Sequence, residues 1–345
     1  MVHPRNVLME SQAGAVSLPV CDHYCGVEAR ITKSLQLQAE MLEEFGTCVF
    51  DVTLDCEDGA PVGGEIDHAN MVTASVFNAF DAPKKAAIFN DKSDNEKTKR
   101  RVAVRVHAVD HASFESDIDI VVGKAGGYLS HVMVPKVDTL ADVERAMALI
   151  DGANTSTNQL PIHVLLESPK AIHNAYDIAA HPRVQSLSFG LMDFVSSHGG
   201  AIPASAMGLA GQFTHPLVVR AKLAIASACH AHGKVPSHCV VTEFNDTAAM
   251  RAAAQRAAHE FGYTRMWSIH PAQIRPILEA MAPDAAAIEV ASEIVLAARA
   301  AQWAPISHKG QLHDRASYRF FWQVLERAHS TGCSLPAEVQ LFFKD

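Results

Sequence analysis

Short apolar runs alternate along the chain with longer segments whose apolar residues recur at helical spacing. The short runs have strand length and are rich in branched residues, so we expect buried strands there. The longer segments predict helices, at Arg30–Glu44, Ala69–Phe80, Thr139–Ile150, roughly Ala171–Ala180, Pro216–Ala231, Ala248–Phe261 and Ala285–Ala301. The expected strands are Leu18–Cys21, Cys48–Leu54, Val102–Val106, His131–Pro135, Ile162–Leu166, Leu187–Phe189, Cys239–Thr242 and Arg265–Ile269.

None of the links between the expected strands resembles a hairpin turn, and this is typical of parallel strands joined by helices. Repetition of the unit along the chain predicts a closed (β/α)8 TIM barrel, whose active site lies at the carboxyl ends of the strands. We assign residues 18–301 to the barrel and residues 1–17 to an irregular N-terminal arm. A doubly wound open sheet is the alternative, but neither a GxGxxG nor a GxxxxGK[ST] motif supports it.

Two carboxylates end neighbouring strands in the middle of the chain. Glu167 follows Ile162–Leu166, and Asp193 follows Leu187–Phe189 across Gly190. Adjacent parallel strands end on one face of a sheet, so both acids would point into one place. Two ionised carboxylates held together repel each other, and a hard cation such as Mg²⁺ removes that repulsion. The alternative is a pair of independent strand-end acids, each hydrogen-bonded to loop backbone.

Further charged residues follow other expected strands. Asp55, Glu57 and Asp58 form an acidic cluster after the second strand, and Arg105 stands at the end of the third. An arginine among acids either neutralises them or grips a substrate carboxylate through its planar fork. Lys136 ends the fourth strand; it is either a Schiff-base nucleophile or, as we expect beside so many acids, an ion-paired structural lysine.

The composition narrows the class of partners. The net charge is −9 over 345 residues, and the only dense basic stretch is Lys97–Arg101, so a nucleic-acid partner is not expected. Seven cysteines without a CxxC pair favour reduced thiols in a cytoplasmic protein. We find neither a secretion signal nor an apolar run of membrane-spanning length, so no membrane partner is expected.

The strand-end motifs together resemble the superfamily of HpcH/HpaI aldolases, citrate lyase β-subunits and malyl-CoA lyases. The resemblance extends from about Val49 to Ala328. The matching stretches, each weak alone but fairly specific in this order, are Asp55-Cys56-Glu57-Asp58-Gly59-Ala60, Val104-Arg105-Val106-His107, Val134-Pro135-Lys136, Leu166-Glu167-Ser168-Pro169, Phe189-Gly190-Leu191-Met192-Asp193 and Ser268-Ile269-His270-Pro271-Ala272-Gln273.

This resemblance implies a barrel with a C-terminal helical lid, here residues 302–345, in a homo-oligomer such as a trimer or hexamer. It implies Glu167 and Asp193 as ligands of Mg²⁺, with Mn²⁺ as a substitute, and Glu167 and Arg105 as substrate contacts. The acidic cluster would lie beside the metal. Asp314, in Gly310-Gln311-Leu312-His313-Asp314-Arg315, matches a tail aspartate that enters a neighbouring subunit's site as acid or base, or else is a solvated loop acid.

The implied reaction is Mg²⁺-dependent carbon–carbon cleavage of a 3-hydroxy-acyl thioester to a 2-keto acid and an acyl thioester. Alternatives are a class II pyruvate-type aldolase acting on free 2-keto or 2-hydroxy acids, a malyl-thioester hydrolase, and a non-catalytic metal-dependent carboxylate binder. His23 and His107 are local alternatives to Asp314 for proton transfer, with a suitable pKa.

Three of the expected strands depart from the family pattern. The usual opening strand, an Arg-Ser motif leading to Pro-Gly, is replaced by Pro19-Val20-Cys21-Asp22-His23-Tyr24-Cys25, which puts the CoA-type carrier in question. Thr264-Arg265-Met266-Trp267 replaces the usual Gly-Lys pair before Ile269-His270-Pro271, and His107 replaces an asparagine. The chain is therefore expected to be a divergent member.

Overall fold

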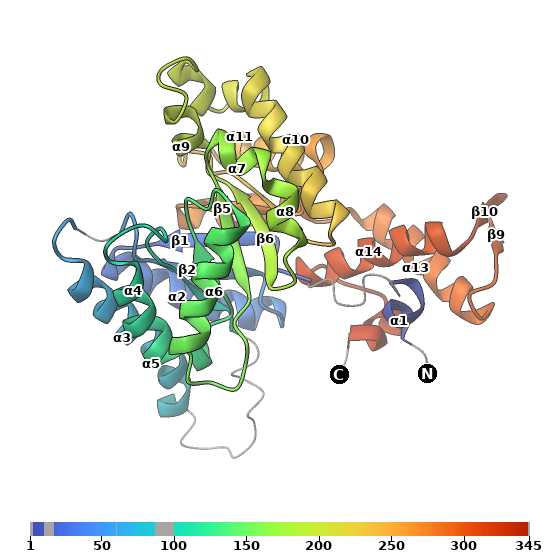
Figure 1. Cartoon of the computed structure of the whole chain (residues 1–345). Coiled ribbons are helices and arrows are strands. Elements are labelled where there is room, and N and C mark those ends of the chain that lie inside the picture. The colour runs from blue at the N-terminus through green and yellow to red at the C-terminus, as the bar shows by residue number, and fades with distance from the viewer. Residues whose placement is uncertain (1–2, 10–16, 60, 87–99, 344–345) are drawn as a thin grey trace.

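The barrel is closed. The structure, a computed structural model, describes residues 3–9, 17–59, 61–86 and 100–343. Eight parallel strands follow one another around the barrel in chain order, and helices surround them (Figure 1). Strand β1 pairs with both β2 and β8, which completes the ring. The predicted (β/α)8 fold is confirmed.

The strands are short and almost entirely buried, as expected when helices cover the outer face and side chains fill the interior. They are β1 (Cys21–Cys25), β2 (Phe50–Asp55), β3 (Val102–Arg105), β4 (Val132–Val134), β5 (Ile162–Leu166), β6 (Val184–Phe189), β7 (Val235–His238) and β8 (Arg265–Ser268).

Most of the expected helices form where the apolar spacing placed them. The long ones are α2 (Glu28–Phe45), α3 (Glu65–Ala86), α6 (Leu140–Ala153), α10 (Pro216–Ala231), α11 (Thr247–Phe261) and α13 (Ala285–Ala300). Thr139 caps α6 in a capping box with Asp142. The shorter ones are α4 (Phe114–Asp117), η1 (Ile118–Val122), α5 (Gly123–Ala125), η2 (Gly126–Tyr128), α7 (Pro169–His173), α8 (Ala175–Ala180), α9 (Leu191–Ser196), η3 (Ala204–Met207), η4 (Gly211–Phe213), η5 (Pro271–Gln273) and α12 (Ile274–Met281).

Two strand predictions were wrong in position. Strand β1 begins at Cys21 rather than ending there, so Asp22 lies inside the barrel instead of at a strand end. Asp22 tolerates this burial because Arg265 of β8 pairs with it at 2.8 Å. Strand β7 is Val235–His238, whereas Cys239–Thr242 is not a strand. Pairing with β6 and β8 thus outweighs the unfavourable proline in Val235–His238.

The C-terminal region is helical but extends away from the barrel (Figure 1). Helices α13 and α14 (Arg315–Ser330) pack together, and the short helix α1 (Pro4–Leu8) of the N-terminal arm packs on α14. Leu8, Ile294 and Trp322 belong to this second apolar core. The remaining elements are the hairpin strands β9 (Ile306–His308) and β10 (Gln311–His313), with α15 (Ala337–Gln340) and η6 (Leu341–Phe343) at the end.

The structure bears in part on the basic stretch and on the possibility of a membrane-spanning helix. Residues 97–99 of the basic stretch lie outside the described residues, whereas Arg101 pairs with Asp51 at the base of the barrel. Within the described ranges, no helix is both long and apolar enough to cross a bilayer.

Candidate active site

Strand β5 carries one side chain into each layer of the barrel interior. Residues two apart on a strand share a face, so His163, Leu165 and Glu167 point inward one above another. Only the last, Glu167, reaches the carboxyl ends of the strands. It lines a cavity of about 550 Å³ there, together with Asp193, Asp55, Asp58 and Arg105. The structure therefore brings the two predicted metal ligands into one cavity.

The Glu167 carboxylate is held by its neighbours. Its Oε1 accepts a hydrogen bond of 2.8 Å from the backbone N–H of Lys136. Its Oε2 lies against Gly190, where a Cβ atom would come within 2.4 Å of that oxygen. Only glycine leaves the carboxylate in place, which gives Gly190 a positional role that the motif alone did not reveal.

Asp193 faces the same cavity from the first turn of α9 and is exposed. Burial, followed by repulsion from Asp193 and Glu57, raises the pKa of Glu167 to about 8. The donor set is composed of hard carboxylate oxygens, and the contacts of Glu167 with the Lys136 amide and its attraction to Arg105 do not cancel the burial and repulsion. It fits a hard dication such as Mg²⁺.

The acidic cluster surrounds Arg105. Asp55 accepts two hydrogen bonds, from Nε at 2.8 Å and from Nη2 at 2.6 Å. Asp58 accepts from Nη2 at 2.8 Å, and Glu57 lies 2.9 Å from Nη1. The guanidinium has five N–H donors, and these four contacts leave one N–H, on Nη1. The planar fork of Arg105 is therefore occupied by Asp55. Of the two roles considered for this arginine, its contacts fit neutralisation of the neighbouring acids.

Lys136 holds the two halves of the site together. Its backbone is left-handed, with φ of 52°, which is uncommon outside glycine and asparagine. That conformation accompanies the amide hydrogen bond to Glu167, while Nζ forms an ion pair of 2.8 Å with Glu57. The contacts agree with the ion-paired lysine that we expected rather than with a free nucleophile. The positioning role of its amide was not visible in the sequence.

The two histidines considered for proton transfer have different hydrogen-bond partners. His23 contacts Ser268 Oγ through Nδ1 and Ser34 Oγ through Nε2, and burial lowers its pKa to about 4. Both of its nitrogens are thus occupied. His107 lies 2.7 Å from Asp117, which raises the histidine pKa through that hydrogen bond. His107 is not among the residues that line the cavity.

Asp314 does not line this cavity in its own chain. It caps α14 directly after strand β10, and Figure 1 shows the β9–β10 hairpin at the far end of the C-terminal arm. Its carboxylate accepts hydrogen bonds from the backbone N–H groups of Ala316 and Ser317. None of the described cavity-lining residues comes from 302–345, so this segment does not cover its own chain's cavity.

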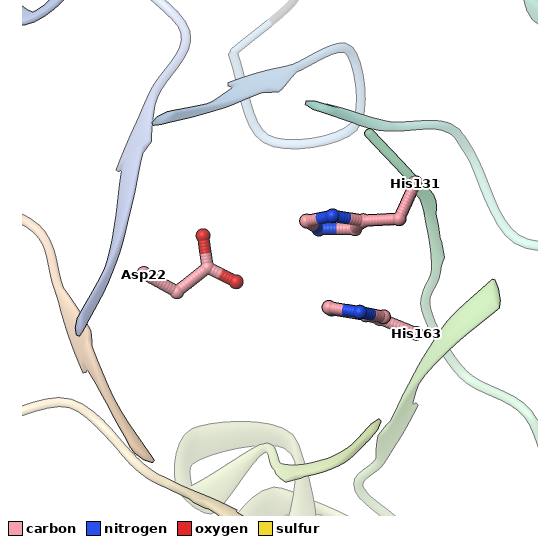
Figure 2. A group of neighbouring side chains, drawn as sticks. All are labelled: Asp22, His131 and His163. Carbon is pink, nitrogen blue, oxygen red and sulfur yellow. The ribbon is translucent and has the colours of Figure 1, made fainter. Parts of the chain in front are cut away.

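A second polar cluster lies deeper in the barrel. Asp22 points inward from one wall, and His131 and His163 point toward it from the opposite wall (Figure 2). Their ligand atoms lie within 4.8 Å of one another. The two rings, however, are stacked 3.5 Å apart at 15°, so no nearby ion can lie in the plane of both. Because the Arg265 guanidinium also binds Asp22, this arrangement does not suit a metal ion.

Comparison with known proteins identifies the family of the chain. The family model described as HpcH/HpaI aldolase/citrate lyase matches residues 36–271. The L-malyl-CoA/beta-methylmalyl-CoA lyase of Cereibacter sphaeroides is 31% identical over 300 residues, covering 81% of this chain and 87% of that protein. The crystal structure of a citrate lyase from Burkholderia xenovorans LB400 is 44% identical, covers 99% of this chain and 100% of its own, and has a TM-score of 0.77.

A more distant structure shows the same fold. Mycobacterium tuberculosis CitE in complex with magnesium, acetoacetate and coenzyme A is 20% identical, covers 90% of this chain and 98% of its own, and has a TM-score of 0.64. The family match covers most of the barrel, including both predicted metal ligands, and the lyase relative covers 81% of the chain. The chain therefore belongs to the HpcH/HpaI aldolase/citrate lyase family and is an enzyme of the carbon–carbon lyase type.

Proposed function

We propose that this enzyme is a Mg²⁺-dependent lyase that cleaves a 3-hydroxy-acyl thioester into a 2-keto acid and an acyl thioester. The observation that carries the proposal is the shared cavity of Glu167 and Asp193, in which burial and then repulsion from Asp193 raise the pKa of Glu167. The C. sphaeroides lyase, whose name specifies a malyl-CoA thioester, supports the substrate class.

In this proposal, Glu167 and Asp193 hold the metal ion. When bound, Mg²⁺ supplies positive charge beside the carboxylate and α-oxygen of the acid. Lys136 fixes Glu167 through its amide, and the acidic cluster fixes the Arg105 guanidinium. The remaining Nη1 hydrogen of Arg105 can donate one hydrogen bond to a substrate oxygen on which negative charge develops. Arg105 is thus a single, rigidly oriented donor rather than a bidentate grip.

The reaction also needs a proton carrier. Cleavage removes a proton from the β-hydroxyl, breaks the adjacent carbon–carbon bond and delivers a proton to the thioester enolate. We assign this transfer to Asp314 of a neighbouring copy, as the family resemblance implies; Asp314 is exposed, which leaves it accessible to another subunit. His23 is less suitable because serine hydroxyls occupy both of its nitrogens.

One observation favours a second candidate, a pyruvate-type aldolase that uses free acids. Strand β1, which in the family helps to hold the thioester carrier, here supplies buried side chains such as Asp22 to the barrel interior. The cavity of about 550 Å³ favours the thioester, because a short keto acid alone would leave much of it empty.

The test is product analysis with malyl and citramalyl thioesters of CoA, with Mg²⁺ and with EDTA. The proposal expects a 2-keto acid and an acyl thioester in equal amounts, only with the metal, and loss of turnover in Glu167→Gln. Release of free CoA with an intact hydroxy acid would instead indicate the hydrolase. Turnover of free hydroxy acids alone would indicate the aldolase, and metal-dependent binding without any product would indicate the non-catalytic binder.

A further inference from the structure

The floor of the cavity is apolar, in contrast to its charged wall. Tyr24, Leu165, Val240 and Trp267 line the cavity, and together with Met133 they form a separate apolar cluster. Tyr24 and Trp267 lie two residues after Asp22 and Arg265 on their strands, and Leu165 lies two residues after His163 and two before Glu167. This spacing places them between the Asp22 cluster of Figure 2 and Glu167. We call these four lining residues the cavity floor.

Two of the four floor residues come from β1 and β8, strands that depart from the family motifs. Tyr24 of β1 stacks on Trp267 of β8, with ring centroids 4.2 Å apart at 25°. The same neighbouring strands contribute the Asp22–Arg265 ion pair beneath. The unusual residues of both strands therefore contact one another, as expected if this part of the barrel has been rebuilt as a unit.

The floor presents carbon atoms to the cavity. Tyr24 Oη and Trp267 Nε1 are both buried, and neither has a hydrogen-bond partner among the described residues. What the cavity meets is therefore the aromatic rings and the aliphatic groups of Leu165 and Val240. The Arg105 guanidinium carbon lies 5.6 Å from the centre of the Tyr24 ring, which places the floor directly beside the charged wall.

Among the described residues, the cation placed beside the floor is Arg105, which three carboxylates already share. The other cations in the lining, Arg30 and Lys33, are exposed on α2. A carboxylate pressed against the rings would lose its hydration without gaining a partner. A hydrocarbon group in the same place would gain from leaving water.

We propose that the cavity floor is a subsite for the side group of the 2-keto acid, selecting a short hydrocarbon group over hydrogen and over a carboxymethyl group. This inference rests on the proposed function, because it takes the acid end of the substrate to be held at Glu167, Asp193 and Arg105. Tyr24 and Trp267 are then the residues that determine specificity.

The test is calorimetric titration of the full chain, in excess Mg²⁺, with glyoxylate, pyruvate, 2-ketobutyrate and oxaloacetate. The dissociation constant should fall by about fourfold for each carbon added from glyoxylate to 2-ketobutyrate. Oxaloacetate, which carries a carboxylate where 2-ketobutyrate has a methyl group, should bind about tenfold more weakly than 2-ketobutyrate.

Three variants examine the floor itself. Trp267→Leu should flatten the series, so that 2-ketobutyrate gains less than about fourfold over glyoxylate in total. Tyr24→Leu opens the other half of the stack and should act likewise if the first variant does not fold. Tyr24→Phe is the matched control: it keeps the ring and should leave the order of the acids unchanged, since the hydroxyl is buried.

The outcomes separate this inference from the proposed function. Oxaloacetate binding as tightly as 2-ketobutyrate, an unaltered series in a folded Trp267→Leu protein, or a changed order in Tyr24→Phe would overturn the apolar subsite alone. If no acid bound in a Mg²⁺-dependent way, the proposed function would fail and the subsite with it.

Discussion

Gly190→Ala should disable the metal site without removing a charge. The added methyl group would lie 2.4 Å from Glu167 Oε2 and 2.5 Å from Glu167 Cβ, whereas ordinary contacts begin at 3.4 Å. Glu167 must therefore move by about 1 Å, several times the tolerance of about 0.2 Å for a metal ligand. The backbone itself accepts alanine, because φ is −91° and ψ is 88°. We expect a loss of at least about tenfold in Mg²⁺ affinity and of about 1–3 kcal/mol in the free energy of unfolding.

The assay is titration of Mg²⁺ by calorimetry, with chemical unfolding in parallel. Gly152→Ala is the matched control, because Gly152 lies in α6 with nothing within 4 Å of its added methyl group. That control should leave Mg²⁺ affinity unchanged and stabilise the fold by up to about 1 kcal/mol. Wild-type Mg²⁺ affinity in Gly190→Ala would refute the reasoning, since Glu167 would then not need its observed position.

Arg105→Lys should lower the free energy of unfolding by about 2–4 kcal/mol and reduce kcat/KM, because one ammonium cannot satisfy three carboxylates; normal denaturation and kinetics would contradict this. Burial holds the pKa of His163 well below its ordinary 6.5, so the unfolded state binds a proton more readily and the free energy of unfolding falls as the pH drops below about 6.5. His163→Leu should reduce this pH dependence by about 1.4 kcal/mol per pH unit, as measured by chemical unfolding at several pH values. An unchanged pH dependence in the variant would contradict this prediction. Asp314→Asn keeps the helix cap but removes the acid, so kcat should fall strongly while the melting temperature stays constant. An unchanged kcat would mean that Asp314 serves only as a helix cap.

The pattern of apolar residues correctly predicted the helices and strands whose buried positions are apolar. Strand β5 and helix α10 form over the predicted residues, because branched and alanine-rich runs there fill the barrel wall. The same reasoning misplaced β1, whose inward face is Asp22 and Tyr24. The burial of Asp22 is explained by its ion pair with Arg265, which lies at the other end of the barrel sequence. Polar strands stabilised by distant partners give no local hydrophobic signal.

The site was predictable only in part, for a related reason. Strand-end position brought Glu167 and Asp193 together, since parallel strands end on one face. The sequence could not show that the fork of Arg105 is occupied by Asp55, because hydrogen-bond geometry depends on side-chain direction. Nor could it reveal the amide of Lys136, since a backbone donor has no residue signature.

A crystal structure of the protein soaked with Mg²⁺ and pyruvate would show whether Glu167 and Asp193 share one divalent ion. We expect one ion with oxygen ligands from both side chains at about 2.1 Å, with the methyl group of the acid facing Tyr24 and Trp267. Pyruvate bound without an ion, or an ion bound only elsewhere, such as at Asp22, would contradict it.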